Sequence, residues 1–88
     1  MDRWEEGKAV LYHGDAREVL QLLSPASIHA VVTDPPYPEI DRDYGRMTEV
    51  EWFELMNVVV PECKRVLSPI GSAVFILQAN QERMGRTR

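Results

Sequence analysis

Three of the four residues at 35–38 are proline, and they follow directly on an apolar run. Proline has no backbone N–H and a fixed φ, so this segment cannot extend the hydrogen-bond ladder of a strand. The apolar residues at 30–32 are consecutive rather than alternating, which is typical of a strand buried on both faces of a parallel sheet. The sequence therefore predicts a buried strand over 28–33 that ends at a stiff loop beginning with Asp34.

The rest of the chain alternates between strand and helix patterns. Short apolar runs predict strands over 9–13 and 72–77, and apolar residues at helical spacing predict helices over 16–23 and 52–66. Together with the strand over 28–33, this order gives two consecutive βαβ units. Right-handed crossovers would place the helices against a parallel sheet. The predicted class is α/β, with the order β-α-β-α-β and parallel strands.

The boundaries of these elements carry their own signals. Asp15 and Thr48 are each followed by glutamate three residues later, which predicts a capping box at the start of each helix. Pro61 should kink or restart the second helix. We expect a polar surface loop over 39–47 and a turn over 68–71 before the last strand.

Composition limits the chain to a single small domain. Its 88 residues carry ten Lys and Arg against fourteen Asp and Glu, so the net charge is −4. Such an acidic chain is not by itself a strong nucleic-acid binder, because phosphate contacts need clustered cations. Cys63 is the only cysteine, which excludes a disulfide framework and a Cys-rich zinc site, and we expect no metal. The sequence contains no apolar stretch of about 20 residues and its N-terminus is acidic, so we expect a cytoplasmic protein without membrane contact.

The loop after residue 33 has the chemistry of a binding site. Ligands of doubly wound sheets lie beyond the carboxyl ends of the strands, where Asp34 is expected. The prolines would leave two acceptors exposed, the Asp34 carboxylate and the Pro35 carbonyl, with the flat ring of Tyr37 beside them. This set suits a planar group that bears an amino function. The alternative is that the segment is only a proline-stiffened turn.

The segment Val31-Val32-Thr33-Asp34-Pro35-Pro36-Tyr37 resembles the signature of S-adenosylmethionine-dependent DNA amino-methyltransferases, which modify the exocyclic nitrogen of adenine or cytosine. Gly14-Asp15 after a short strand and Arg65-Val66-Leu67 before the last strand resemble the same family in the same order. The resemblance covers about 9–77. It implies a Rossmann-like methyltransferase sheet, S-adenosylmethionine as cofactor and DNA as partner.

The resemblance also implies roles for individual residues. The target nucleotide is rotated out of the duplex, and Tyr37 stacks on its base. Asp34 and the carbonyl of Pro35 accept hydrogen bonds from the amino group, and Pro36 completes the catalytic motif. Asp34 and Asp15 would also meet the cofactor, Asp15 at its adenine. Capping of the following helix is the other reading of Asp15, and the two readings are compatible.

Three more side chains are expected to be structural. Trp52 and Phe53 are expected in the core rather than at a base, and Cys63 is expected to be a core residue because no covalent enzyme intermediate is required.

The sequence departs from the family in what it lacks. The family's cofactor site contains an aromatic-x-Gly-x-Gly loop, and nothing here matches it. Ile70 also replaces the glycine usual in the family's Pro-Gly-Gly turn. We therefore expect 1–88 to be the N-terminal portion of such an enzyme, a partial catalytic domain without the glycine loop and the DNA-recognition segment. The missing strands would leave sheet edges unpaired, which favours association of copies of the chain.

Two alternatives remain open. Related RNA or protein-glutamine amino-methyltransferases are the first, although they more often have asparagine where this chain has Asp34. A non-catalytic α/β module that binds a partner or dimerises through its unfinished sheet is the second. The reading frame beyond residue 88 would discriminate between an enzyme and a module, since an aromatic-x-Gly-x-Gly loop there would settle the enzymatic reading.

Overall fold

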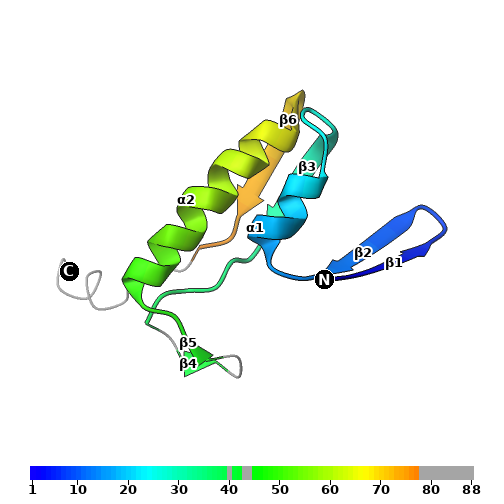
Figure 1. The fold of residues 1–88 in the computed structure, drawn as a ribbon. Helices are drawn as coiled ribbons and strands as arrows, with labels where there is room; N and C mark the ends of the chain where they lie inside the picture. Colours follow the sequence, from blue (N-terminus) through cyan, green and yellow to red (C-terminus); the bar gives the residue numbers. More distant parts are fainter. Residues whose placement is uncertain (40, 43–44, 78–88) are drawn as a thin grey trace.

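The computed structural model describes residues 1–39, 41–42 and 45–77. It confirms a mixed α/β chain (Figure 1). In chain order the elements are β1 (Asp2–Glu6), β2 (Ala9–His13), α1 (Ala16–Val19), the 3₁₀ helix η1 (Leu20–Leu22), β3 (Ile28–Thr33), β4 (Asp41–Arg42), β5 (Gly45–Arg46), α2 (Glu49–Val66) and β6 (Leu67–Phe75).

One βαβ unit, β3–α2–β6, forms the centre of the fold. β3 and β6 are parallel neighbours, with Ala30 opposite Ser72 and Thr33 opposite Phe75. α2 packs against β6 and also contacts α1 and η1, so the helices lie together beside the two-stranded sheet (Figure 1). Both strands end on the same side, and the loop that begins at Asp34 leaves from that edge.

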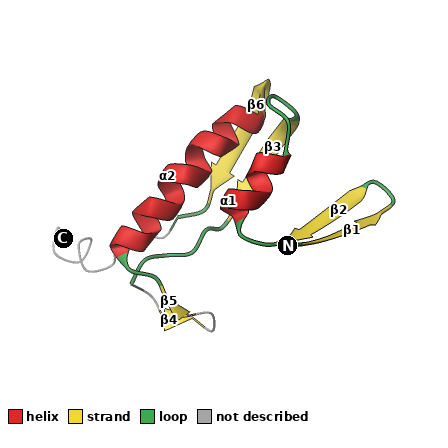
Figure 2. Cartoon of the chain, in the orientation of Figure 1, coloured by secondary structure: helices red, strands yellow, loops and turns green. Residues whose placement is uncertain are grey.

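The prediction of a second βαβ unit is wrong. β2 does not join the parallel sheet but pairs antiparallel with β1, from Asp2 opposite His13 to Glu6 opposite Ala9. The two form a separate hairpin, shown apart from the helices in Figure 2. An antiparallel partner needs only a two-residue turn, whereas a parallel partner needs a long crossover. Gly7, at φ +58°, supplies the left-handed residue of that turn.

α2 begins as its sequence predicts. The amide of Glu51 donates to Oγ1 of Thr48 at 3.1 Å, and the amide of Thr48 donates to Oε1 of Glu51 at 3.0 Å, so the capping box is confirmed. α2 then continues across Pro61 to Val66, so the helix is not restarted there. The first helix differs from expectation, because α1 is only one turn long and passes into η1.

The predicted turn at 68–71 is instead an irregular part of β6. Leu67 already pairs with Ile28, and the next pair is Ala30 with Ser72. The chain therefore advances five residues along β6 but only two along β3 between these pairs, which is a bulge in β6. Gly71 permits this close passage, because a Cβ there would lie 3.0 Å from the carbonyl oxygen of His29. The expected loop at 39–47 likewise contains the short antiparallel hairpin of β4 and β5.

The apolar core of the described residues is small. Cys63 and Val66, on α2, are its buried hydrophobic residues, and this confirms the structural expectation for Cys63. Burial raises the pKa of the Cys63 thiol. The expectation that β3 is buried on both faces is wrong, because Val32 is 73% exposed. Among the described residues the helices cover one face of the sheet, and no layer covers the other (Figure 2).

Candidate functional site

Asp34 stands at the carboxyl edge of the parallel pair. It follows Thr33, the last residue of β3, whose carbonyl accepts a hydrogen bond of 2.9 Å from the amide of Ile76 just beyond β6. The side chain of Asp34 is exposed rather than turned into the core. Its carboxylate is therefore available at the position where sheets of this kind place their ligands.

Tyr37 is brought onto Asp34 by its hydroxyl group. The phenol O–H lies 2.7 Å from Oδ1 of Asp34 and 3.3 Å from the carbonyl oxygen of Ile76. The ring is half-buried and reaches from the loop to the end of the neighbouring strand. The acid and the phenol ring expected at one place are thus in direct contact.

The two prolines between them differ in their surroundings. Pro35 is buried, which differs from the expectation of an exposed acceptor at this residue, and Pro36 is half-buried. The indole Nε1–H of Trp52 donates to the carbonyl oxygen of Pro36 at 2.6 Å. Among the described residues no donor meets the carbonyl of Pro35, which lies in the same loop as the exposed Asp34 carboxylate.

Glu39 ties the end of this loop to the start of α2. Its Oε1 accepts from the amide of Glu49 at 3.1 Å, and its Oε2 accepts from Nη2 of Arg46 at 2.8 Å. The Arg46 guanidinium and then the Glu49 amide lower the pKa of Glu39. The backbone amide of Glu39 also donates to the carbonyl of Met47 at 2.7 Å. The loop over 34–39 is therefore fastened at both of its ends.

Sequence reasoning missed two of these supports. Trp52 was expected in the core but is half-buried and bonded to the loop, and its neighbour Phe53 is 57% exposed, so the core expectation for Phe53 is wrong. Glu39 lies in a stretch expected to be only a polar surface loop. The sequence offered one signal for the role of Trp52. Trp52 lies four residues after the cap Thr48, so it belongs to the first turn of α2, next to the loop.

Asp15 is the cap of α1. Its Oδ1 accepts from the amide of Arg17 at 2.9 Å, and its two oxygens also receive Nε and Nη2 of the same arginine at 3.0 and 2.7 Å. Capping by Asp15 is therefore confirmed, but the expected capping box with Glu18 is wrong, because the Asp15 side chain accepts from the amide of Arg17 and the amide of Glu18 donates to the backbone carbonyl of Asp15. The Arg17 guanidinium and amide lower the pKa of Asp15 from 3.8 to about 2. No bond joins Asp15 to the loop at 34–37 among the described residues.

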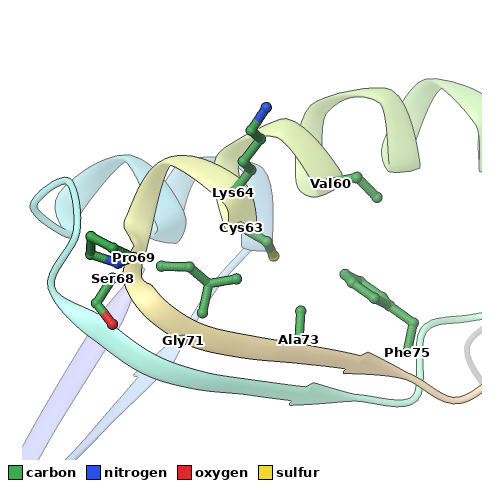
Figure 3. A pocket seen from close by; sticks show the side chains of 9 residues that line it. Val60, Cys63, Lys64, Ser68, Pro69, Gly71, Ala73 and Phe75 are labelled. Carbon is green, nitrogen blue, oxygen red and sulfur yellow. The ribbon is translucent and has the colours of Figure 1, made fainter.

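A pocket of about 400 Å³ lies elsewhere, between α2 and β6 (Figure 3). Its lining is mostly apolar, and the buried hydroxyl of Ser68 has no hydrogen-bond partner within the described part of the chain. The lining does not include the loop at 34–37. Its residues are Val60, Cys63, Lys64, Leu67, Ser68, Pro69, Gly71, Ala73 and Phe75.

Two classes of site find no support in the part of the chain that the structure describes. His, Cys, Asp and Glu side chains do not gather there in threes, as a metal ion would need. None of its helices is both long and apolar enough to cross a membrane.

Chemically, the loop offers carboxylate and carbonyl acceptors beside an aromatic ring, on a backbone poor in N–H groups. A planar heterocycle with an amino group could donate to both acceptors while its face lies on the ring.

Comparison with known proteins finds two similar methyltransferases. The Type II methyltransferase M.Cfr9I of Citrobacter freundii is 34% identical over 71 residues, and the Type II methyltransferase M.XycI of Xanthomonas campestris pv. cyanopsidis is 35% identical over 71 residues. Each match covers 73% of this chain and 23% of the relative. The chain thus spans about a quarter of the length of these relatives. No family model and no solved structure matches.

Proposed function

We propose that this chain carries the catalytic loop of an S-adenosylmethionine-dependent DNA methyltransferase that modifies the exocyclic amino group of adenine or cytosine. The similarity to Type II methyltransferases supports a methyltransferase relationship. The observation that carries the proposal is the contact between the Tyr37 hydroxyl and the exposed carboxylate of Asp34 at the end of β3. It joins an acceptor for an amino group to a ring that can stack on a base.

Each residue of the loop would have a separate role in methyl transfer. A base inside a duplex cannot be reached by an enzyme, so the target nucleotide must be rotated out of the stack. Tyr37 would stack on the extruded base. The Asp34 carboxylate and the Pro35 carbonyl would accept hydrogen bonds from its amino group and so orient the nitrogen lone pair. Pro36 would keep the turn stiff, as its fixed φ requires.

The cofactor would meet the carboxylates at the strand ends. When bound, S-adenosylmethionine supplies a methyl group on a positively charged sulfur. Asp34 and Asp15 fit such a ligand chemically, because both are exposed and accept hydrogen bonds, and the low pKa of Asp15 keeps it ionised. We propose that Asp15 meets the adenine of the cofactor through Oδ2, which accepts one bond from Arg17 and can accept a second.

The chain as given would act as part of a larger Rossmann-like catalytic domain. It contains no aromatic-x-Gly-x-Gly loop. Among the described strands, β3 and β6 pair only with each other, so each has a free outer edge. Free edges of this kind favour pairing with further strands or with another copy of the chain.

The test is methyl transfer by the protein expressed from the complete reading frame, measured as incorporation of labelled methyl groups into DNA. Asp34→Ala should abolish incorporation and leave DNA affinity nearly unchanged, because contacts to phosphate dominate affinity. Glu6→Ala, which removes an exposed carboxylate of β1, is the matched control and should keep full activity. A wild-type protein that methylates no DNA would refute the proposal, and loss of DNA binding together with activity in Asp34→Ala would make Asp34 structural.

A further inference from the structure

Trp52 joins α2 to the prolines of the loop by a hydrogen bond. Its Nε1–H donates to the carbonyl oxygen of Pro36 at 2.6 Å, in a partly buried position and across 16 residues of sequence. The amide of Trp52 is itself bonded to the carbonyl of Thr48 at 2.9 Å, in the first turn of α2. The donor therefore sits on a capped, ordered helix start rather than on a loose segment.

The loop depends on donors from outside because it has few of its own. Over 34–38 only Asp34 and Tyr37 have a backbone N–H, since the other three residues are prolines. The indole nitrogen is a donor only, so its bond fixes the direction of the carbonyl that it meets. That carbonyl shares a planar peptide group with the nitrogen of Tyr37. A bond that holds the Pro36 carbonyl in place therefore also holds the orientation of the backbone at Tyr37.

The bond from Trp52 involves neither the carbonyl of Pro35 nor the carboxylate of Asp34. Trp52 donates to the carbonyl of Pro36, while the carbonyl of Pro35 meets no donor among the described residues. The hydroxyl of Tyr37 then reaches Oδ1 of Asp34 at 2.7 Å. We infer that Trp52 is a positioning residue, which holds the peptide between Pro36 and Tyr37 so that the Asp34 carboxylate and the phenol ring stay in register. The catalytic consequence of this inference rests on the proposed function.

The structural part is tested by NMR on the full 88-residue chain, with the indole of Trp4 as an internal reference. Trp4 is 54% exposed and Trp52 is half-buried. The indole proton of Trp52 should exchange with water at least about tenfold more slowly than that of Trp4, as a hydrogen-bonded group does. Equal exchange rates for the two indoles would overturn the inference, and this measurement needs no substitution.

Variants extend the test to the loop itself. Trp52→Phe keeps an aromatic ring and removes the donor, and it should shift the amide resonances of Asp34 and Tyr37. Phe53→Leu is the matched control, because the exposed ring of Phe53 contacts that of Trp52 edge-on at 5.2 Å between centroids. This control should leave both amides unchanged. Unshifted loop amides in a folded Trp52→Phe chain would overturn the inference.

Kinetics separate this inference from the proposed function. In the protein expressed from the complete reading frame, Trp52→Phe should lower kcat about tenfold, the value of one well-placed hydrogen bond, with little change in KM for DNA. An unchanged kcat in an active protein would refute the positioning role. If wild-type protein transfers no methyl group while the NMR results hold, the proposed function fails and the role of Trp52 in holding the loop stands.

Discussion

Replacing the half-buried Arg65 with methionine should destabilise this fold clearly. The guanidinium of Arg65 donates from Nη1 to the carbonyl of Leu23 at 3.0 Å and from Nη2 to that of Leu20 at 2.8 Å. Its Nε also lies 2.7 Å from Oε2 of Glu62. One side chain thus joins the end of α2 to both ends of η1. Methionine keeps much of the length of the side chain and removes every donor.

The size of the effect follows from these contacts. A hydrogen bond from a charged donor is worth about 1.5–3 kcal/mol, and two of them to carbonyls are lost. The Arg65 side chain is 32% exposed, so water replaces part of each bond. The ion pair with Glu62 adds only about 0.2–1 kcal/mol, as partly exposed pairs do. Because water replaces part of each bond, we expect Arg65→Met to lower the free energy of unfolding by about 2–3 kcal/mol, which is less than the sum of these values.

Thermal unfolding followed by circular dichroism measures this loss. For a chain of this size, 1 kcal/mol shifts Tm by about 4–8 °C, so the expected decrease is on the order of 10 °C or more. Lys64→Met, which removes the exposed neighbouring cation, is the matched control and should change Tm by at most a few degrees. Glu62→Gln breaks only the ion pair and should be intermediate. A Tm for Arg65→Met no lower than that of the control would refute the reasoning.

Three further predictions concern the loop and the two caps. Tyr37→Phe keeps the ring but frees Asp34 of its hydroxyl donor, so methyl incorporation should fall by about tenfold or less, and an activity as low as that of Tyr37→Ala would contradict a role for the ring. Thr48→Ala should lower the free energy of unfolding by about 1 kcal/mol in urea titrations, while Thr48→Ser retains the cap, and equal midpoints for both would contradict it. Arg17 lowers the pKa of Asp15 from 3.8 to about 2 in the folded chain. The ionised carboxylate therefore contributes its full stabilisation of the fold above pH 3.8, and this contribution is lost as the pH falls through about 2. Asp15→Asn should abolish this part of the acid sensitivity, and an unchanged acid transition in that variant would contradict the assignment.

The local features of the chain were readable from its sequence. The cap at Thr48, the helix that follows and the strand before Asp34 depend on periodicity and capping within a few residues. The stiff loop followed from the proline count alone. These features are decided by short-range sterics and hydrogen bonding, so neighbouring residues suffice to specify them.

Long-range pairing was not readable in the same way. The strand over 9–13 was expected in the parallel sheet, yet it pairs with the residues just before it, because a short antiparallel hairpin was available. The apolar run at 30–32 predicted burial on both faces, but the described residues cover only one. Periodicity indicates which residues of a helix or strand share an apolar face, but it does not indicate which other element packs on that face.

By itself, then, the sequence determined an α/β chain with a βαβ unit, two helix caps and a proline-rich corner that begins with Asp34. Only the tertiary structure decided that the Tyr37 hydroxyl meets Asp34, that Trp52 bonds to Pro36 across 16 residues, and that Arg65 reaches Leu20 across 45. The physical reason is the range of the interactions. Caps and turns are settled among adjacent residues, whereas a distant donor and acceptor meet only after the helices and strands have packed.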